Sequence, residues 1–141
     1  MKTLTLLIVV LCLIGTVVAS LALREHYNTE ASPCSINERW DCGIVNHSPF
    51  AAMKGVPVAI IGILGYTLLA ALAGRFPLVT AAAAVGGLAF SLRLTWIEWK
   101  VLETWCIYCV TSQSVIAAIT VLAVVAAIVD RRKSSGTSKS A

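Results

Sequence analysis

Four long runs of apolar residues divide the chain, and short polar segments separate them. The runs cover about residues 4–23, 56–73, 77–97 and 106–129. Each approaches the ~20 apolar residues that a helix needs to cross a hydrocarbon core of about 30 Å. Because a backbone inside lipid must satisfy its own hydrogen bonds, each run is expected to form a helix. The pattern therefore predicts an all-α integral membrane four-helix bundle, with a polar loop over residues 24–55 between the first two helices.

Composition supports a membrane protein. Of the 141 residues, 58% are hydrophobic and 13% are charged, whereas soluble domains carry about 25% charged residues. So few charges cannot cover the surface of a water-soluble globule, and the apolar surplus is expected to face lipid. The formal net charge of +4 comes from scattered or terminal basic residues, so no nucleic-acid partner is expected.

The two ends of the chain require separate interpretation. The first run follows Lys2, as in a secretory signal peptide, but it is longer than the ~7–15 residues of a signal's apolar segment. A retained membrane helix is therefore favoured. After Asp130 the chain is basic and then rich in Ser, Gly and Thr, a composition typical of disorder. We expect a membrane domain over residues 1–130 and a disordered basic tail over residues 131–141.

The basic residues also predict an orientation. Lys2, Arg75 and the cluster 131–133 fall on one side of a bundle with an even number of spans. The positive-inside rule makes that side cytoplasmic. We therefore expect a multi-pass protein of the cell (inner or cytoplasmic) membrane, with the loop 24–55 and the turn 98–105 outside the cytoplasm. Disulfides form and persist there.

Four of the five cysteines would lie at this outer edge. Cys34 and Cys42 are in the long loop, and Cys106 and Cys109 open the last apolar run. If Thr104 caps that helix, Cys106 falls in its first turn, where the helix N-terminus stabilises a thiolate. Cys109 lies on the same face, one turn deeper toward the lipid. This geometry suits the passage of electrons from a water-soluble donor to a lipid-soluble acceptor.

Other interpretations of these residues stay open. Cys34 and Cys42 could form a structural disulfide that braces the loop, and four cysteines could bind zinc, although C-x7-C is wider than the usual ligand spacing. Two dithiols on one membrane face can also exchange through mixed disulfides. Gln113, one turn beyond Cys109, is either an interhelical hydrogen-bonding residue or a ligand for the carbonyl oxygen of a bound molecule. Cys12, alone in the first run, is expected to pack as a small apolar residue.

Together these features resemble the vitamin K epoxide reductase family. The resemblance covers about residues 4–129 and rests on four helices, a cysteine pair in the first outer loop, and Cys106-Ile107-Tyr108-Cys109 at the start of the last helix. The stretches Trp40 to Ser48 and Gly55 to Tyr66 are similar to the bacterial branch.

The resemblance implies roles for individual residues. Cys106 and Cys109 would be the active-site pair, with Cys109 meeting the quinone. Cys34 and Cys42 would be the shuttle pair, and Ser48 matches a hydroxyl residue that family members carry after that pair.

The chain departs from the animal enzymes of the family at two places. Gln113 stands where they carry a tyrosine, and Val58 lies near the position of their asparagine. These departures weaken the case for epoxide reduction and leave quinone reduction intact.

The predicted function is that of a membrane dithiol:quinone oxidoreductase. It would reoxidise a separate thioredoxin-like extracytoplasmic protein, reduce a quinone of the ubiquinone, menaquinone or phylloquinone type from the lipid pool, and drive disulfide formation in exported proteins. The alternative is a non-enzymatic four-helix membrane scaffold braced by structural disulfides. An unrelated four-helix family of quinone-linked disulfide generators carries its C-x-x-C nearer the N-terminus, so the order of the pairs argues against it.

Overall fold

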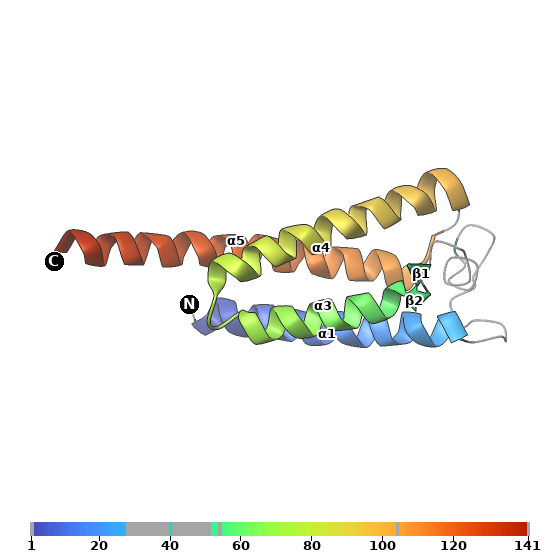
Figure 1. Cartoon of the computed structure of the whole chain (residues 1–141), viewed down its shortest axis with the longest axis horizontal. Coiled ribbons are helices and arrows are strands. Elements are labelled where there is room, and N and C mark those ends of the chain that lie inside the picture. The colour runs from blue at the N-terminus through green and yellow to red at the C-terminus, as the bar shows by residue number, and fades with distance from the viewer. Residues whose placement is uncertain (1, 28–39, 41–51, 54, 104, 141) are drawn as a thin grey trace.

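The computed structural model describes residues 2–27, 40, 52–53, 55–103 and 105–140. Within them the prediction of an all-α membrane bundle is confirmed (Figure 1). The elements in chain order are α1 (Lys2–Tyr27), β1 (Ala52–Met53), β2 (Val56–Pro57), α3 (Val58–Leu72), α4 (Pro77–Ile97), the π-helical turn η2 (Glu98–Leu102) and α5 (Ile107–Ser140). The two short strands form an antiparallel pair just before α3.

The four long helices pack in the order α3, α1, α5 and α4. Helix α1 packs against α3 and α5, and α4 packs along α5. The tight connection between α3 and α4 lies at one end of the bundle, and the strand pair lies at the other (Figure 1). That second end also gathers the end of α1, the end of α4 and the start of α5. The cysteine pair of the last apolar run is therefore placed where four helix ends meet.

Small residues on α1 allow this close packing. The buried positions of α1 recur every three or four residues and so lie on one face of the helix; they include Cys12, Gly15, Ala19 and Ala22. The ring of Tyr66 on α3 lies directly over Gly15, where an added Cβ would be 2.5 Å from two ring carbons. Cys12 is 1% exposed, as expected for a packing residue.

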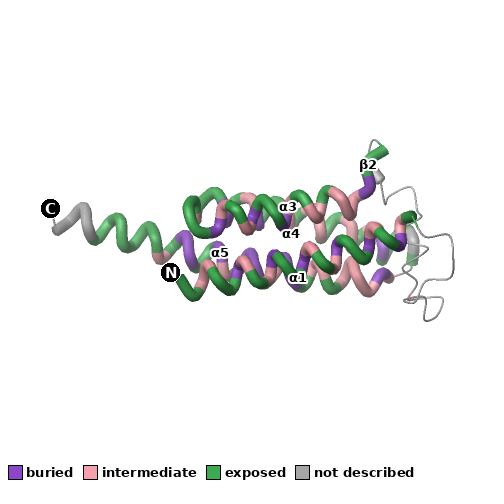
Figure 2. Tube along the Cα trace, turned by 90° about the horizontal axis from the view of Figure 1, so that it is seen from below, coloured by how far each residue is buried: buried purple, intermediate pink, exposed green. Residues whose placement is uncertain are grey.

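The outer surface of the bundle is apolar. Large hydrophobic side chains are exposed on every helix, among them Leu13, Leu64, Leu78 and Val121 (Figure 2). Three of the described helices are long and apolar enough to cross a membrane: Lys2–Tyr27, Pro77–Val101 and Ile107–Gly136. Together with the apolar exterior, these spans identify a membrane protein.

Helix α3 is shorter than the run 56–73 predicted from hydropathy. It begins at Val58 because Val56 and Pro57 pair with β1, and Pro57 adopts an extended backbone with ψ 136°. At 1.5 Å per residue its 15 residues rise about 22 Å, less than the ~30 Å of a hydrocarbon core. Helix α4, in contrast, begins at Pro77 as predicted.

The other helix ends also differ from the apolar runs. Helix α1 covers Lys2–Tyr27 rather than 4–23, and α5 continues through the predicted tail to Ser140. The extension of α5 projects beyond the bundle, and residues 131–136 are exposed (Figures 1 and 2). Arg131, Arg132 and Lys133 are good helix formers, which favours continuation of the helix just past the apolar run.

Candidate redox site at the start of α5

Cys106 lies at the very start of α5. It immediately precedes the first helical residue, and its carbonyl accepts the hydrogen bond of the Val110 N–H at 3.0 Å. These are the properties of an N-cap residue. The sequence pattern places Cys106 in the first turn, whereas the helix begins one residue later. The predicted cap, Thr104, lies outside the described residues. Cys106 is 0% exposed.

Cys109 follows in the first turn of α5. Its side chain is partly buried, packs against Cys106 and hydrogen-bonds to it. In the described part of the chain, no disulfide joins these two sulfurs. The two residues therefore form a dithiol at a helix N-terminus, where the backbone N–H groups and the helix dipole favour negative charge.

The chain approaches this dithiol through a distorted turn. Helix α4 ends at Ile97 and continues as η2, whose C-terminal neighbour Glu103 has a left-handed backbone with φ 54°. The Glu103 N–H returns to the Glu98 carbonyl. Wide π-helical turns occur frequently at functional sites. Here the turn reverses the chain so that the end of α4 lies beside the start of α5.

Glu98, the first residue of η2, is buried beside the cysteines. It is 3% exposed, and its Oε2 accepts a hydrogen bond from the Cys106 N–H at 3.3 Å. The carboxylate also hydrogen-bonds to the Cys109 thiol. Sequence analysis placed residue 98 only in the outer turn 98–105 and assigned it no role at the site. Its place at the end of an apolar run, eight residues before Cys106, was the available signal.

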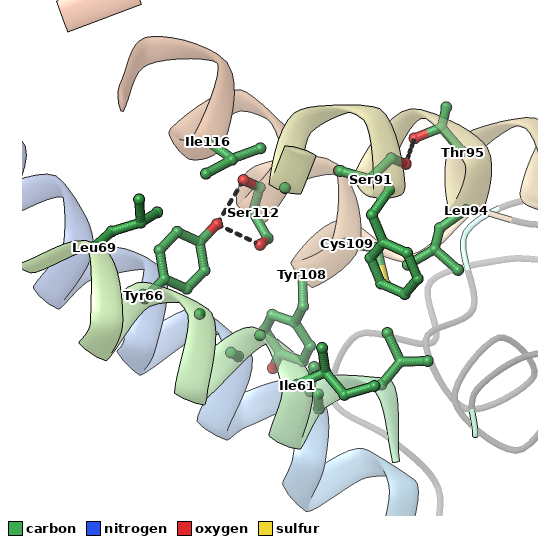
Figure 3. A pocket seen from close by; sticks show the side chains of 18 of the residues that line it. Ile61, Tyr66, Leu69, Ser91, Leu94, Thr95, Tyr108, Cys109, Ser112 and Ile116 are labelled. Carbon is green, nitrogen blue, oxygen red and sulfur yellow. Dashed lines mark hydrogen bonds between the residues drawn. The ribbon is translucent and has the colours of Figure 1, made fainter. Parts of the chain in front are cut away.

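A cavity of about 330 Å³ opens between the helices beside Cys109 (Figure 3). Apolar side chains form most of its wall, including Ile61 of α3, Leu94 of α4 and Ile116 of α5. Cys109 and Glu98 line the same space. The volume lies at the lower end of the ~300–1,000 Å³ typical of small-molecule sites, which are mostly apolar with a few polar groups.

Two hydroxyl groups form a polar spot in this cavity. The Tyr66 hydroxyl donates to the Ser112 carbonyl at 2.9 Å and lies 2.7 Å from the Ser112 Oγ (Figure 3). The pair ties α3 to α5 close to Cys109. Tyr66 had no assigned role in the sequence analysis, because its place opposite α5 depends on how the helices pack.

Gln113 occupies a different place from Ser112. Its amide oxygen accepts a hydrogen bond from the Thr95 hydroxyl of α4. Of the two interpretations left open by the sequence, the structure shows the interhelical hydrogen bond. Among the described residues that line the cavity, Ser112 is present and Gln113 is not. The predicted contact between Gln113 and a bound ligand is not supported by the position of its side chain, and it stays a prediction.

The long loop reaches the dithiol at one described point. Trp40 forms an isolated parallel β-bridge with Trp105, and their rings lie 6.2 Å apart between centroids. Trp105 directly precedes Cys106. Three other predicted site residues, Cys34, Cys42 and Ser48, lie outside the described residues, so their roles stay predictions.

The fold and the site define a class: membrane proteins with a dithiol at a helix end, next to an apolar cavity. A sequence model of the vitamin K epoxide reductase family matches residues 6–124. The chain therefore belongs to the vitamin K epoxide reductase family. Members of this family are, in general, membrane oxidoreductases that link disulfide chemistry to quinones. No curated protein sequence matches the chain significantly.

Proposed function

We propose that this protein is a dithiol:quinone oxidoreductase. It takes electrons from a separate thioredoxin-like protein outside the cytoplasm and gives them to a quinone of the membrane pool. The reoxidised partner then introduces disulfides into exported proteins. The main support for the proposal is the position of Cys109. This residue packs against Cys106 and also lines the apolar cavity.

The cavity residues fit a quinone head group. Flat apolar rings are bound by apolar walls with a few oriented polar groups. The apolar side chains of Ile61, Leu94 and Ile116 line this cavity together with the hydroxyl-bearing Tyr66 and Ser112. A bound quinone supplies an acceptor for two electrons and two protons. The Cys109 thiol is the redox group that lines this space.

The chain's own cysteines supply the relay. The partner's thiolate attacks a Cys34–Cys42 disulfide at Cys34, which releases Cys42 as a thiolate. The partner's second thiol then resolves the mixed disulfide and releases Cys34. Cys42 attacks Cys106 of the second disulfide and releases Cys109, and Cys34 closes the first disulfide again. Each exchange moves two electrons. Cys106 and Cys109 are then the reduced dithiol.

The bridge between Trp40 and Trp105 supports this relay. Cys42 follows Trp40 by two residues and Cys106 follows Trp105 by one. Two residues of chain extend at most about 7 Å, so a bridge at these tryptophans allows Cys42 to approach Cys106 for exchange. The positive-inside assignment puts this end of the bundle outside the cytoplasm, where a thioredoxin-like oxidant operates.

Quinone reduction by the purified full-length chain tests the proposal. The chain is placed in lipid vesicles, dithiothreitol serves as electron donor and ubiquinone-1 or menadione as acceptor, and quinol formation is followed optically. Cys109→Ala is expected to lose dithiol-dependent quinone reduction. Cys12→Ala is the matched control, because Cys12 is a buried cysteine of α1 and not one of the cavity residues; it should retain the wild-type rate. Undiminished turnover by Cys109→Ala would contradict the proposal.

A cell-based experiment tests the biological direction. Cells that lack their own disulfide-generating membrane enzyme should regain disulfide-dependent growth when they express this chain together with a suitable soluble thioredoxin-like protein. An inert scaffold would give no growth under any pairing. It would also trap no mixed disulfides when Cys34 or Cys106 is replaced by alanine.

A further inference from the structure

The side chain of Glu98 is a buried carboxylate beside the dithiol. Glu98 is 3% exposed at the junction of α4 and η2. Burial of a carboxylate away from water is costly unless hydrogen bonds compensate it. A neutral Ser, Asn or Thr satisfies a helix N-terminus at much lower cost. Capping of α5 alone therefore does not explain why an acid stands here.

The contacts of Glu98 join the reacting groups to the cavity. Its Oε2 accepts the Cys106 N–H at 3.3 Å, and the carboxylate hydrogen-bonds to the Cys109 thiol. It also lines the cavity that Cys109 faces. His26 of α1 lines the same cavity. The side-chain hydrogen-bond partners of the Cys109 thiol are Glu98 and Cys106, so Glu98 is the acid–base group in contact with that thiol.

We propose that Glu98 is a catalytic residue that accepts the proton of the Cys109 thiol and passes it to an oxygen of the quinone. This inference rests on the proposed function. A base must lie within hydrogen-bonding reach of the proton that it removes, and Glu98 meets this condition for Cys109. Its contact with Cys106 through the backbone N–H holds the carboxylate at the dithiol.

The step balances in atoms and electrons. The S–H bonds of Cys106 and Cys109 break and one S–S bond forms between them. The electron pair goes to the quinone, which leaves as quinol with two added protons. One of these protons travels from Cys109 through Glu98, and the Glu98 carboxylate is restored when it gives that proton up.

Kinetics of Glu98→Gln separate proton transfer from capping. Gln keeps the volume of the side chain and an oxygen that accepts the Cys106 N–H, but it cannot take up the thiol proton. We expect kcat for quinone reduction with dithiothreitol to fall about 100-fold, the lower end of general acid–base contributions, while KM for ubiquinone-1 stays within about twofold. Glu103→Gln, the same change at an exposed acid five residues away, should leave both values unchanged.

A quinone-free measurement gives an independent readout. In the dithiol state the Cys109 thiol hydrogen-bonds to Glu98, and this donor disappears when the disulfide forms. The redox-difference infrared spectrum of the full chain, taken without quinone, should therefore show a carboxyl band. That band should persist in Glu103→Gln and vanish in Glu98→Gln.

The outcomes are distinguishable. If the wild-type chain reduces no quinone, the proposed function fails. If the wild type turns over and Glu98→Gln keeps the wild-type kcat, or keeps the wild-type carboxyl band, the role of Glu98 is refuted while the function stands. Should Glu98→Gln not insert into the membrane, Glu98→Ala with added formate decides the question: a rate that rises with formate supports proton transfer, and a rate that does not rise overturns it.

Discussion

The contact between Gly15 and Tyr66 allows a sharp test of the packing that shapes the cavity. In Gly15→Ala the new methyl carbon would lie 2.5 Å from Cε1 and Cζ of the Tyr66 ring and 2.7 Å from Cδ1. Ordinary contacts between carbons are about 3.5–4.0 Å. The α1 and α3 surfaces must therefore separate by about 1 Å, or the ring must move.

The magnitude follows from three contributions. Overpacking of this kind costs about 1–3 kcal/mol, and displacement of the Tyr66 hydroxyl from Ser112 removes a hydrogen-bonding contribution of about 1 kcal/mol. The higher helix propensity of Ala offsets about 1 kcal/mol. The expected net loss in the free energy of unfolding is about 1–3 kcal/mol. Gly86→Ala is the matched control, because an added Cβ on this α4 glycine meets nothing within 4 Å, so it should be no less stable than the wild type.

Reversible unfolding in mixed micelles, with increasing dodecyl sulfate, measures both variants. A double-mutant cycle with Tyr66→Ala assigns the loss, since removal of the ring should relieve the Gly15→Ala penalty and give a coupling energy of at least about 1 kcal/mol. If Gly15→Ala proves as stable as Gly86→Ala, or the cycle shows no coupling, the described α1–α3 contact is wrong.

Three further variants test the polar groups around the cavity. Tyr66→Phe removes the hydroxyl contacts with Ser112 and should cost about 1 kcal/mol in unfolding free energy while it raises KM for ubiquinone-1; an unchanged KM would remove Tyr66 from the quinone site. Gln113→Leu breaks the hydrogen bond with Thr95 and should cost about 0.6–1.7 kcal/mol with KM unchanged, as unfolding and steady-state assays would show; a several-fold rise in KM would restore Gln113 as a ligand. Trp105→Ala should slow, several-fold, the transfer of electrons from the loop cysteine pair to the dithiol in rapid-quench thiol trapping, and an unaltered rate would refute a guiding role for the tryptophan contact.

Much of the fold could be predicted from the sequence because lipid imposes a simple rule. Apolar runs long enough to span a bilayer become helices, and a proline at the first position marks a helix start, as at Pro77. The rule does not fix where a helix ends. The start of α3 depends on a strand pair formed with Ala52–Met53, and α5 continues to Ser140 although the apolar run ends near Val129.

The candidate site was predictable only in part. The spacing of Cys106 and Cys109 places two thiols on one helix face, and the structure brings them together. The position of Glu98 depends on the π-helical turn that returns the chain to α5, and no short-range pattern encodes such a turn. Tyr66 and Gln113 show the same limit, since their partners Ser112 and Thr95 lie on other helices and only packing selects them.

A single-turnover experiment tests the central claim most directly. The full-length chain with Cys34→Ala and Cys42→Ala, which lacks the loop pair that would reduce the dithiol again, is reduced, freed of reductant, and mixed anaerobically with a slight excess of ubiquinone-1. Quinol and free thiols are then quantified together. The account predicts that each chain with Cys106 and Cys109 as thiols produces one quinol. Peptide mapping should then show a disulfide between these two cysteines. Quinol formed while Cys106 and Cys109 remain free thiols, or no quinol at all, would contradict it.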